Sequence, residues 1–126
     1  MKRIAQIMTP QPWTVQLEDS LGVARRMLAE REIHHLPVLD AGAVVGMVTE
    51  RDLALASDRL RTVADVMLPV HPVASNTPVD QVLDEMATQR WDAVVVTEDG
   101  TVEGIFTAMD AVRVLRDVVR HRRARA

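Results

Sequence analysis

The chain lacks cysteine and tyrosine altogether, and its large aromatic residues are one phenylalanine and two tryptophans among 126 residues. Without cysteine it can form neither a disulfide bond nor a thiolate site for catalysis or metal binding. It contains no run of about 18 apolar residues, the length that a membrane-spanning helix needs. The first residues also lack the long apolar stretch of a secretory signal. These absences favour a cytoplasmic protein.

Neither sign of charge dominates the chain. Lysine and arginine total 15 residues, aspartate and glutamate total 18, and the formal net charge is −3. This balance gives the whole protein no attraction for nucleic acid or for an anionic membrane surface. Basic residues gather only at 120–125, where the sequence reads RHRRAR. The hydrophobic share of 48% is that of a folded globular protein, and the length predicts one compact module, 1–126.

The sequence contains the same pattern twice. Residues 4–10 (IAQIMTP) return as residues 63–69 (VADVMLP), and residues 43–52 (AVVGMVTERD) return as residues 101–110 (TVEGIFTAMD). In the second pair of segments, one glycine, one threonine and one aspartate keep the same spacing in both copies. A repeat of about 60 residues is one supersecondary unit that is marginal alone, so the two copies are expected to bury a shared core.

Hydrophobic periodicity and turn residues predict the same order of elements in each copy. In the first copy, 1–58, we expect a helical turn at 4–8, an extended piece at 14–15, a helix from about 20 to 31, a β-hairpin at 35–48 and a helix from 52 to 57. In the second copy, 59–119, we expect a helical turn at 63–67, a helix after 78, strands at 93–96 and 101–106, and a helix from 108 to about 120. Residues 120–126 are expected to form a basic tail.

Each copy carries a threonine and an aspartate at the point where a strand gives way to a helix. Thr49 and Asp52 form the first pair, and Thr107 and Asp110 form the second, 58 positions later. The free N–H groups of a helix N-terminus and a threonine hydroxyl can bind phosphate, and a carboxylate can accept hydrogen bonds from ribose hydroxyls. A glycine three positions before each threonine permits close approach of another backbone. This arrangement suits a nucleotide.

The same spacing also has a structural interpretation. Thr-x-x-Asp before a helix is a capping pattern, and a cap would be duplicated with the rest of the repeat. Arg51 lies beside the expected phosphate position, although a solvated surface arginine would look the same. Trp13 and Trp91 are expected in a core or an interface rather than against a base. The adjacent histidines at 34–35 point to opposite faces of a strand, so they are not expected to share a metal ion.

The combination of these segments resembles the CBS domain, named for cystathionine beta-synthase. The resemblance covers residues 1 to about 117, and it rests on IHHLPVLD at 33–40 and VGMVTERD at 45–52. The second copy departs from the pattern, because WDAV at 91–94 replaces the His-His-Leu-Pro segment and Ala-Met at 108–109 replaces Glu-Arg. The resemblance implies an α/β (α+β) fold of two tandem β-α-β-β-α repeats, packed through their sheets with pseudo-two-fold symmetry.

In this family the cleft between the repeats commonly binds AMP, ADP, ATP or S-adenosylmethionine. The resemblance therefore implies a non-catalytic regulatory module, for example in energy sensing, with no catalytic residue, metal site or cofactor. The side chains expected to bind ligand are Thr49, Arg51, Asp52, Thr107 and Asp110. The segments expected to line the adenine pockets are His35, Leu36, Pro37, Ala93 and Val94. The altered second copy predicts that the Asp52 site binds phosphorylated ligands more tightly than the Asp110 site.

Protein partners are expected as well. Apolar helix faces predict a homodimer, because a monomer would expose too large an apolar patch. The residues of these faces are Leu21, Ala24, Met27, Val79, Val82, Leu83, Met86, Leu115, Val118 and Val119. A separate effector protein would read the ligand-bound state. Two alternatives stay open: a structural dimerisation module without a physiological ligand, and a weak nucleic-acid binder through the arginine-rich C-terminus.

Overall fold

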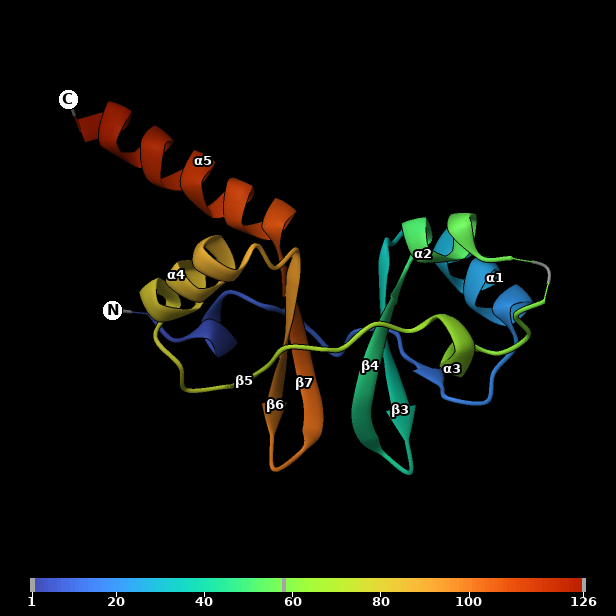
Figure 1. Cartoon of the computed structure of the whole chain (residues 1–126). Helices are drawn as coiled ribbons and strands as arrows, with labels where there is room; N and C mark the ends of the chain where they lie inside the picture. The colour runs from blue at the N-terminus through green and yellow to red at the C-terminus, as the bar shows by residue number, and fades with distance from the viewer. Residues whose placement is uncertain (1, 58, 126) are drawn as a thin grey trace. The chain divides into compact units, whose positions relative to one another are not determined.

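The computed structural model describes residues 2–57 and 59–125, and it divides the chain into two compact units, each with its own β-sheet and helices (Figure 1). Unit 2 consists of Gln11–Val70 and Asp99–Val102, and it holds the strands of the first sequence copy. Unit 1 consists of the chain up to Pro10, His71–Glu98 and the chain from Glu103 onward. The predicted mixed α/β class is confirmed.

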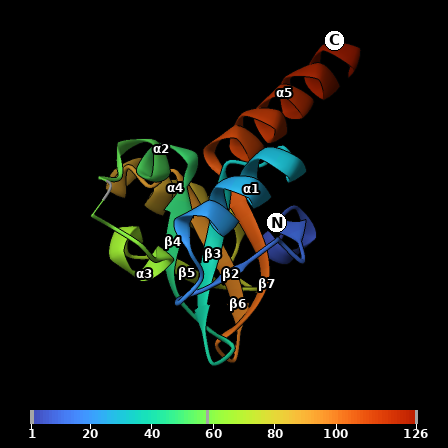
Figure 2. The same cartoon turned by 90° about the vertical axis from the view of Figure 1, so that its right-hand side faces the viewer.

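Unit 2 is built on a three-stranded sheet with the order β2-β3-β4 (Figure 2). Its strands are β2 (Val15–Gln16), β3 (His35–Asp40) and β4 (Ala43–Thr49), and its helices are α1 (Leu21–Arg31), α2 (Glu50–Leu55) and α3 (Val63–Val66). Strand β2 runs parallel to β3, while β3 and β4 form the predicted antiparallel hairpin. Because parallel neighbours need a crossover connection, α1 lies between β2 and β3 in the chain.

The bounds of α1 follow from its sequence. Ser20 is the N-cap, and its Oγ accepts a hydrogen bond at 3.2 Å from a backbone N–H three residues later. The helix ends at Glu32, whose left-handed backbone (φ 54°) is a common way to close a helix. Leu21, Ala24 and Leu28 lie on one face and are buried in the core of unit 2. This face positions α1 against the sheet.

Unit 1 is built on a four-stranded sheet with the order β1-β7-β6-β5. Its elements are η1 (Ile4–Gln6), β1 (Thr9–Pro10), β5 (Pro72–Ala74), α4 (Val79–Gln89), β6 (Ala93–Glu98), β7 (Thr101–Thr107) and α5 (Ala108–Arg125). The largest buried side chain of its core belongs to Phe106. Helix α5 continues five residues beyond the predicted end at about Arg120, so the basic segment is helical through Arg125 rather than a tail.

The leading segment of each copy pairs with the sheet of the other copy. Strand β1, near the start of the first copy, pairs antiparallel with β7, with Thr9 opposite Ile105. The matching segment near the start of the second copy pairs with β4, where Met47 and Leu68 exchange two backbone hydrogen bonds of 2.9 Å. The compact units therefore differ from the sequence repeats 1–58 and 59–119, because each unit contains a segment from both.

The repeated glycines make room for these crossing segments. A Cβ atom on Gly104 would lie 2.8 Å from the carbonyl oxygen of Thr9 and would overlap the Met8 side chain. A Cβ atom on Gly46 would lie 2.6 Å from the Sδ of Met67. The close approach that the sequence predicted at each glycine is thus made by another segment of the same chain.

The helix faces predicted to form a dimer are largely used inside the units. Leu21, Ala24 and Leu28 on α1 are buried, and so are Val79, Val82 and Met86 on α4. These side chains face the core because α1 and α4 are the helices that cover the sheets. The predicted dimer surface is therefore wrong for Leu21, Ala24, Val79, Val82 and Met86. Met27 and Leu83 are half-buried, and Leu115, Val118 and Val119 on α5 are exposed as predicted.

The crossing segments yield a first prediction. Gly104→Ala should lower the free energy of unfolding by about 1–3 kcal/mol, because a methyl group there meets a backbone carbonyl that has no room to move. Gly22→Ala is the matched control: Gly22 lies in α1 with only ordinary contacts, and alanine there should stabilise by about 0.5–1 kcal/mol. Urea unfolding measures both, and equal effects of the two substitutions would contradict this account.

Candidate functional site

The first threonine–aspartate pair joins the end of β4 to the start of α2. Thr49 is the N-cap of α2, and its Oγ1 accepts a hydrogen bond from the Asp52 backbone N–H at 3.2 Å. In return, Asp52 Oδ2 accepts one hydrogen bond from the Thr49 backbone N–H at 3.0 Å and one from the Thr49 hydroxyl at 2.9 Å. This reciprocal pair is a capping box, so the structural interpretation of the motif is confirmed here.

The second pair repeats this geometry with one addition. The Thr107 backbone N–H donates to Asp110 Oδ2 at 2.9 Å, and the Asp110 backbone N–H donates to Thr107 Oγ1 at 3.2 Å. The other carboxylate oxygen, Oδ1, accepts a hydrogen bond from Arg113 Nη1 at 3.1 Å. Arg113 was not among the predicted site residues, although an arginine three residues after an aspartate on a helix lies on the same face. Both carboxylate oxygens of Asp110 are therefore engaged.

A third capping box occurs away from both candidate sites. Thr62 is the N-cap of α3, and Asp65 Oδ2 accepts hydrogen bonds from the Thr62 backbone N–H at 3.0 Å and the Thr62 hydroxyl at 3.2 Å. This pair follows no strand of the sheet and belongs to the segment that crosses to β4. The Thr-x-x-Asp spacing alone therefore does not mark a ligand site.

The chemistry left at Asp52 distinguishes it from the other two pairs. Within residues 2–57 and 59–125, Asp52 Oδ1 has no hydrogen-bond partner, whereas Asp110 Oδ1 is bonded to Arg113. The neighbouring Arg51 is exposed and makes no hydrogen bond or ion pair with the described part of the chain. In the second copy Met109 takes the place of this arginine. Within the described residues, the first copy thus has an unbonded carboxylate oxygen on Asp52 and an unpaired cation on the residue before it.

The expected contribution of the helix N-terminus to phosphate binding is small. Helix α2 has only six residues, which limits its dipole. Its first N–H, on Glu50, donates to the His34 carbonyl at 3.2 Å, and the Asp52 N–H is used in the capping box. In the second copy the Ala108 N–H likewise donates to the Asp92 carbonyl, at 2.8 Å. The exposed Arg51 is therefore the stronger candidate for a phosphate contact.

The residues predicted to line the adenine pockets are mostly buried in their own units. Leu36, Pro37 and Val94 are fully buried, and Ala93 is nearly so, which leaves their backbone rather than their side chains for a ligand. His35 is half-buried and lies directly opposite Thr49 in the β3–β4 pairing. The structure therefore brings one predicted pocket residue next to the first capping box.

The neighbouring His34 faces solvent. His34 directly precedes β3, and its Nδ1 lies 2.6 Å from Glu50 Oε2. Within the described residues, no three histidine, aspartate or glutamate side chains come together in a way that could hold a metal ion.

The tryptophans have different environments. Trp13 is half exposed, with the Arg31 guanidinium 3.9 Å from its ring centroid, so it is not part of a core within the chain, and its place in an interface stays a prediction. Trp91 is half-buried and stacks on His71 with the ring centroids 4.1 Å apart. The Arg31 guanidinium over the indole face stabilises the exposed Trp13 side chain by a cation–π interaction.

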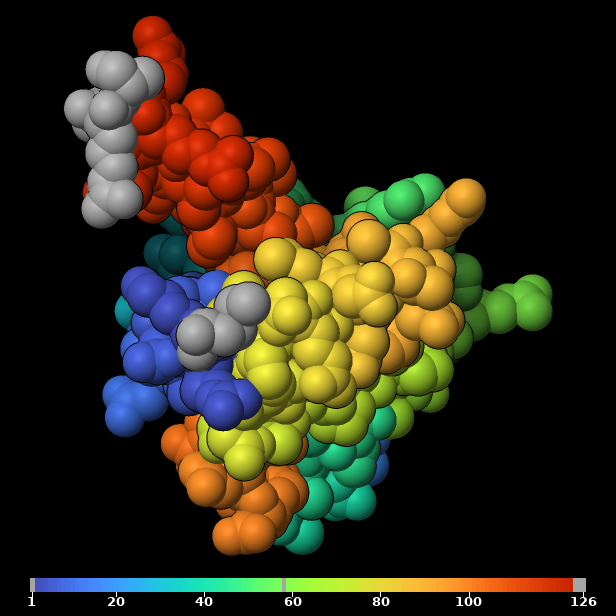
Figure 3. Space-filling model, turned by 90° about the vertical axis from the view of Figure 1, so that its left-hand side faces the viewer, coloured from blue at the N-terminus to red at the C-terminus, as the bar shows by residue number. Residues whose placement is uncertain are grey.

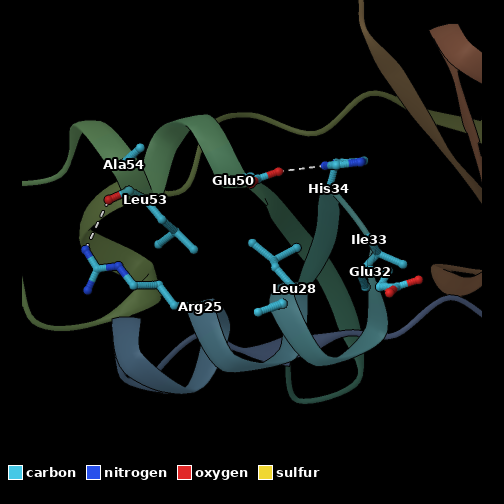
Figure 4. Close-up of a pocket in the computed structure, with 9 residues that line it drawn as sticks. Arg25, Leu28, Glu32, Ile33, His34, Glu50, Leu53 and Ala54 are labelled. Carbon is cyan, nitrogen blue, oxygen red and sulfur yellow. Dashed lines mark hydrogen bonds and ion pairs between the residues drawn. The ribbon is translucent and has the colours of Figure 1, made fainter.

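A pocket of about 460 Å3 lies between α1 and α2, apart from the capping boxes (Figure 4). Its floor is apolar, with Leu28, Leu53 and Ile33, and the Arg25 guanidinium closes one end by donating to the Leu53 carbonyl at 3.0 Å. The His34–Glu50 pair lies at the other end. We call this feature the α1–α2 groove. No sequence motif predicted it.

The described helices include none that is long and apolar enough to cross a membrane.

The Asp65 capping box also sets a pKa. The backbone N–H groups of Thr62 and Arg61 donate to the carboxylate of Asp65, and these bonds hold its pKa below the ordinary 3.8. A carboxylate whose pKa is lower in the folded than in the unfolded state stabilises the fold at pH values above the unfolded-state pKa. This stability is lost as the pH falls through the folded-state pKa.

We therefore predict a specific acid sensitivity. Asp65→Asn keeps the shape of the side chain but removes its charge, so its deficit in free energy of unfolding against wild type should shrink as the pH falls from about 6 to about 3. Urea unfolding across this range measures the difference. A deficit that stays constant with pH would show that the carboxylate charge does not contribute.

Comparisons with known proteins place this geometry in context. The model of the CBS domain family matches residues 4–59 and again residues 63–117. Inosine-5'-monophosphate dehydrogenase of Thermoplasma acidophilum is 31% identical over 114 residues, which cover 89% of this chain and 23% of that enzyme. The chain thus spans about a quarter of the length of this relative.

Two solved structures match nearly the whole chain. One is the CBS domain pair of protein MJ0100 in complex with 5'-methylthioadenosine and S-adenosyl-L-methionine, with a TM-score of 0.82 and 28% identity over 93% of this chain and 98% of that one. The other is CBSX2 in complex with AMP, with a TM-score of 0.82 and 25% identity over 94% of this chain and 98% of that one.

Proposed function

We propose that this chain, which belongs to the CBS domain family, is a non-catalytic sensor that binds an adenosine-containing ligand through Asp52. The observation that carries the proposal is that, within the described residues, Asp52 Oδ1 is unbonded and the preceding residue, Arg51, is an exposed cation without a partner. The complexes of MJ0100 and CBSX2 support the ligand class, since both similar structures hold adenosine compounds. A separate effector protein then responds to the ligand-bound state.

Capping and binding are compatible at Asp52. Thr49 occupies only Oδ2, so the capping box fixes the carboxylate in place before a ligand arrives. The free Oδ1 has two lone pairs and can accept hydrogen bonds from ribose hydroxyls. Because the carboxylate is already ordered, less conformational entropy is lost when the ligand binds. The structural role therefore supports the proposed binding role.

The two candidate sites are unequal. Asp110 would have to release Arg113, or share its Oδ1 with it, in order to accept a ribose hydroxyl. Its neighbour Met109 offers no charge for a phosphate, whereas Arg51 does. We therefore assign tighter binding of phosphorylated ligands to the Asp52 site and weaker binding to the Asp110 site. Thr49, Arg51 and the backbone at His35 belong to the first site.

Asp52→Ala should weaken AMP binding by about 1.5–3 kcal/mol, or roughly 10- to 150-fold in Kd, because it removes the ribose acceptor. Asp65→Ala is the matched control, since it removes the same kind of cap from α3 without touching either site. Isothermal titration calorimetry with AMP measures both variants. If Asp52→Ala and Asp65→Ala bind AMP with the wild-type Kd, Asp52 is only a cap and the proposed function fails.

Arg51→Met tests the phosphate contact with a residue that the second copy already uses at this position. Its Kd for AMP should rise about tenfold, while its Kd for adenosine, which lacks the phosphate, should stay at the wild-type value. Calorimetry with both ligands on the same preparation gives the two values. An equal loss of affinity for AMP and for adenosine would show that Arg51 does not contact the phosphate.

A second candidate function, structural self-association, is favoured by the exposed apolar side chains of α5. Val112, Leu115, Val118 and Val119 are each exposed by 46% or more in the single chain. Apolar rows of this kind on a helix commonly mark a protein interface. We include a homodimer in the proposal, and it is independent of ligand binding. The structure adds no observation in favour of nucleic-acid binding by the arginines.

A further inference from the structure

Each of the two segments that cross between the copies carries a methionine. Met8 in IAQIMTP and Met67 in VADVMLP hold the same place in the repeated pattern. The side chain of Met8 lies where a Cβ atom on Gly104 would be, with its Cγ 2.7 Å from that position. The Sδ of Met67 lies 2.6 Å from the corresponding position on Gly46. Each thioether therefore fills the space that a strand glycine leaves.

The polar atoms nearest to these contacts are hydrogen-bond acceptors. The Thr9 carbonyl oxygen lies 2.8 Å from the Cβ position on Gly104, and the Leu68 carbonyl oxygen lies 3.1 Å from that on Gly46. The Leu68 N–H is already used, because it donates to the Met47 carbonyl at 2.9 Å. A thioether suits such a place, since its sulfur packs as an apolar group and accepts only weakly. A sulfoxide oxygen there would meet a second acceptor instead of a donor.

Neither of these two methionines is enclosed in a core. Both are half-buried, whereas Met47 and Met86 are buried. The segment that carries Met8, blue in Figure 3, lies at the surface of unit 1 beside the start of α4, where the Ile4 N–H donates to the Thr77 carbonyl at 2.8 Å. Because the chain has no cysteine, methionine is the sulfur that a peroxide can oxidise.

We propose that Met8 and Met67 are modification sites at which a hydroperoxide forms methionine sulfoxide and thereby loosens the crossing segments. The sulfur lone pair attacks a peroxide oxygen, so an S–O bond forms as the O–O bond breaks. The proton of the transferred hydroxyl passes to the departing hydroxide, which leaves as water. The sulfur is oxidised by two electrons and the peroxide is reduced. Methionine sulfoxide reductases reverse this change, so the sites are switchable.

The Met67 contact lies close to the first candidate site along the chain. Gly46 and Thr49 belong to the same strand, β4, and Thr49 caps the helix that follows. When the crossing segment loosens, β4 loses the backbone hydrogen bonds that join it to this segment. Oxidation of Met67 should therefore also weaken ligand binding at Asp52. This consequence rests on the proposed function, whereas the loss of stability does not.

Treatment of the full chain with hydrogen peroxide tests the sites directly. Peptide mass spectrometry gives the oxidised fraction at each methionine, and urea unfolding gives the folding equilibrium constant of the same sample. This constant should fall about tenfold as Met8 and Met67 are oxidised, and methionine sulfoxide reductases should restore it. An unchanged constant after full oxidation of both residues overturns the proposal, and so does a peroxide that oxidises other methionines but leaves these two intact.

Two double variants assign the effect to its residues. Met8→Leu with Met67→Leu should resist the peroxide, because leucine keeps an apolar contact of similar volume and is not oxidised. Met27→Leu with Met109→Leu is the matched control: these residues lie on α1 and α5, outside the crossing segments, and the variant should stay as sensitive as wild type. A first variant that loses as much stability as wild type overturns the proposal. If it does not fold, the wild-type measurement decides alone.

Calorimetry with AMP on Met8→Leu, before and after oxidation, follows the consequence for the first site. Its Kd should rise about tenfold when Met67 is oxidised and return after reduction. A chain that binds no AMP in either state, yet loses stability on oxidation, overturns the proposed function and supports the oxidation sites. An unchanged Kd at a reduced stability overturns only the link between Met67 and Asp52.

Discussion

The pairing of each leading segment with the other copy's sheet is the contact on which the rest of the structure depends. Thr9 of β1 pairs with β7 and Leu68 pairs with β4, so a segment near the start of each copy adds backbone hydrogen bonds to the sheet of the other copy. The contact explains why a glycine recurs in β4 and β7, because a side chain at either position would meet the incoming segment. It also makes the folding of the two units interdependent, since each unit contains segments from both halves of the sequence.

The same two strands carry the candidate sites. Three residues after each glycine, the strand ends in a threonine that caps the following helix. The crossing segment fixes the strand, the capping box fixes the aspartate, and the carboxylate oxygen that the cap does not use is what remains for a ligand. The copies diverge at this last step: Arg113 takes up the free oxygen of Asp110, while Asp52 keeps its own. A duplicated fold has in this way produced two chemically different positions.

The sequence predicted most of the elements because their signals are local. The hairpin of β3 and β4, the helix α1 and the helical turn of α3 all appear where hydrophobic periodicity and turn residues placed them. The crossing of the leading segments could not be predicted, since backbone pairing between segments that are not neighbours in the chain, such as Thr9 with Ile105 and Met47 with Leu68, leaves no local pattern. The same holds for the burial of the α1 and α4 faces, because periodicity shows that a face is apolar but not what covers it.

The candidate site was predicted in part for the same reason. The spacing of Thr49 and Asp52 identified the residues, but the capping box at Asp65 shows that spacing cannot separate a cap from a ligand site. That distinction lies in single atoms, the free Oδ1 of Asp52 and the occupied Oδ1 of Asp110, which only coordinates reveal. The α1–α2 groove likewise arises from residues of two helices and a loop that no single motif joins.

The most direct test of the central claim is to follow the backbone amides of the 15N-labelled chain by NMR while AMP is added. If Asp52 binds the ligand, the amides of Thr49, Arg51 and Asp52 should show saturable shifts, with no shift at Asp65, whose capping box is the internal reference. Amides at 49–52 that do not move, or that move no more than the amide of Asp65, would contradict the assignment of an adenosine site to this chain.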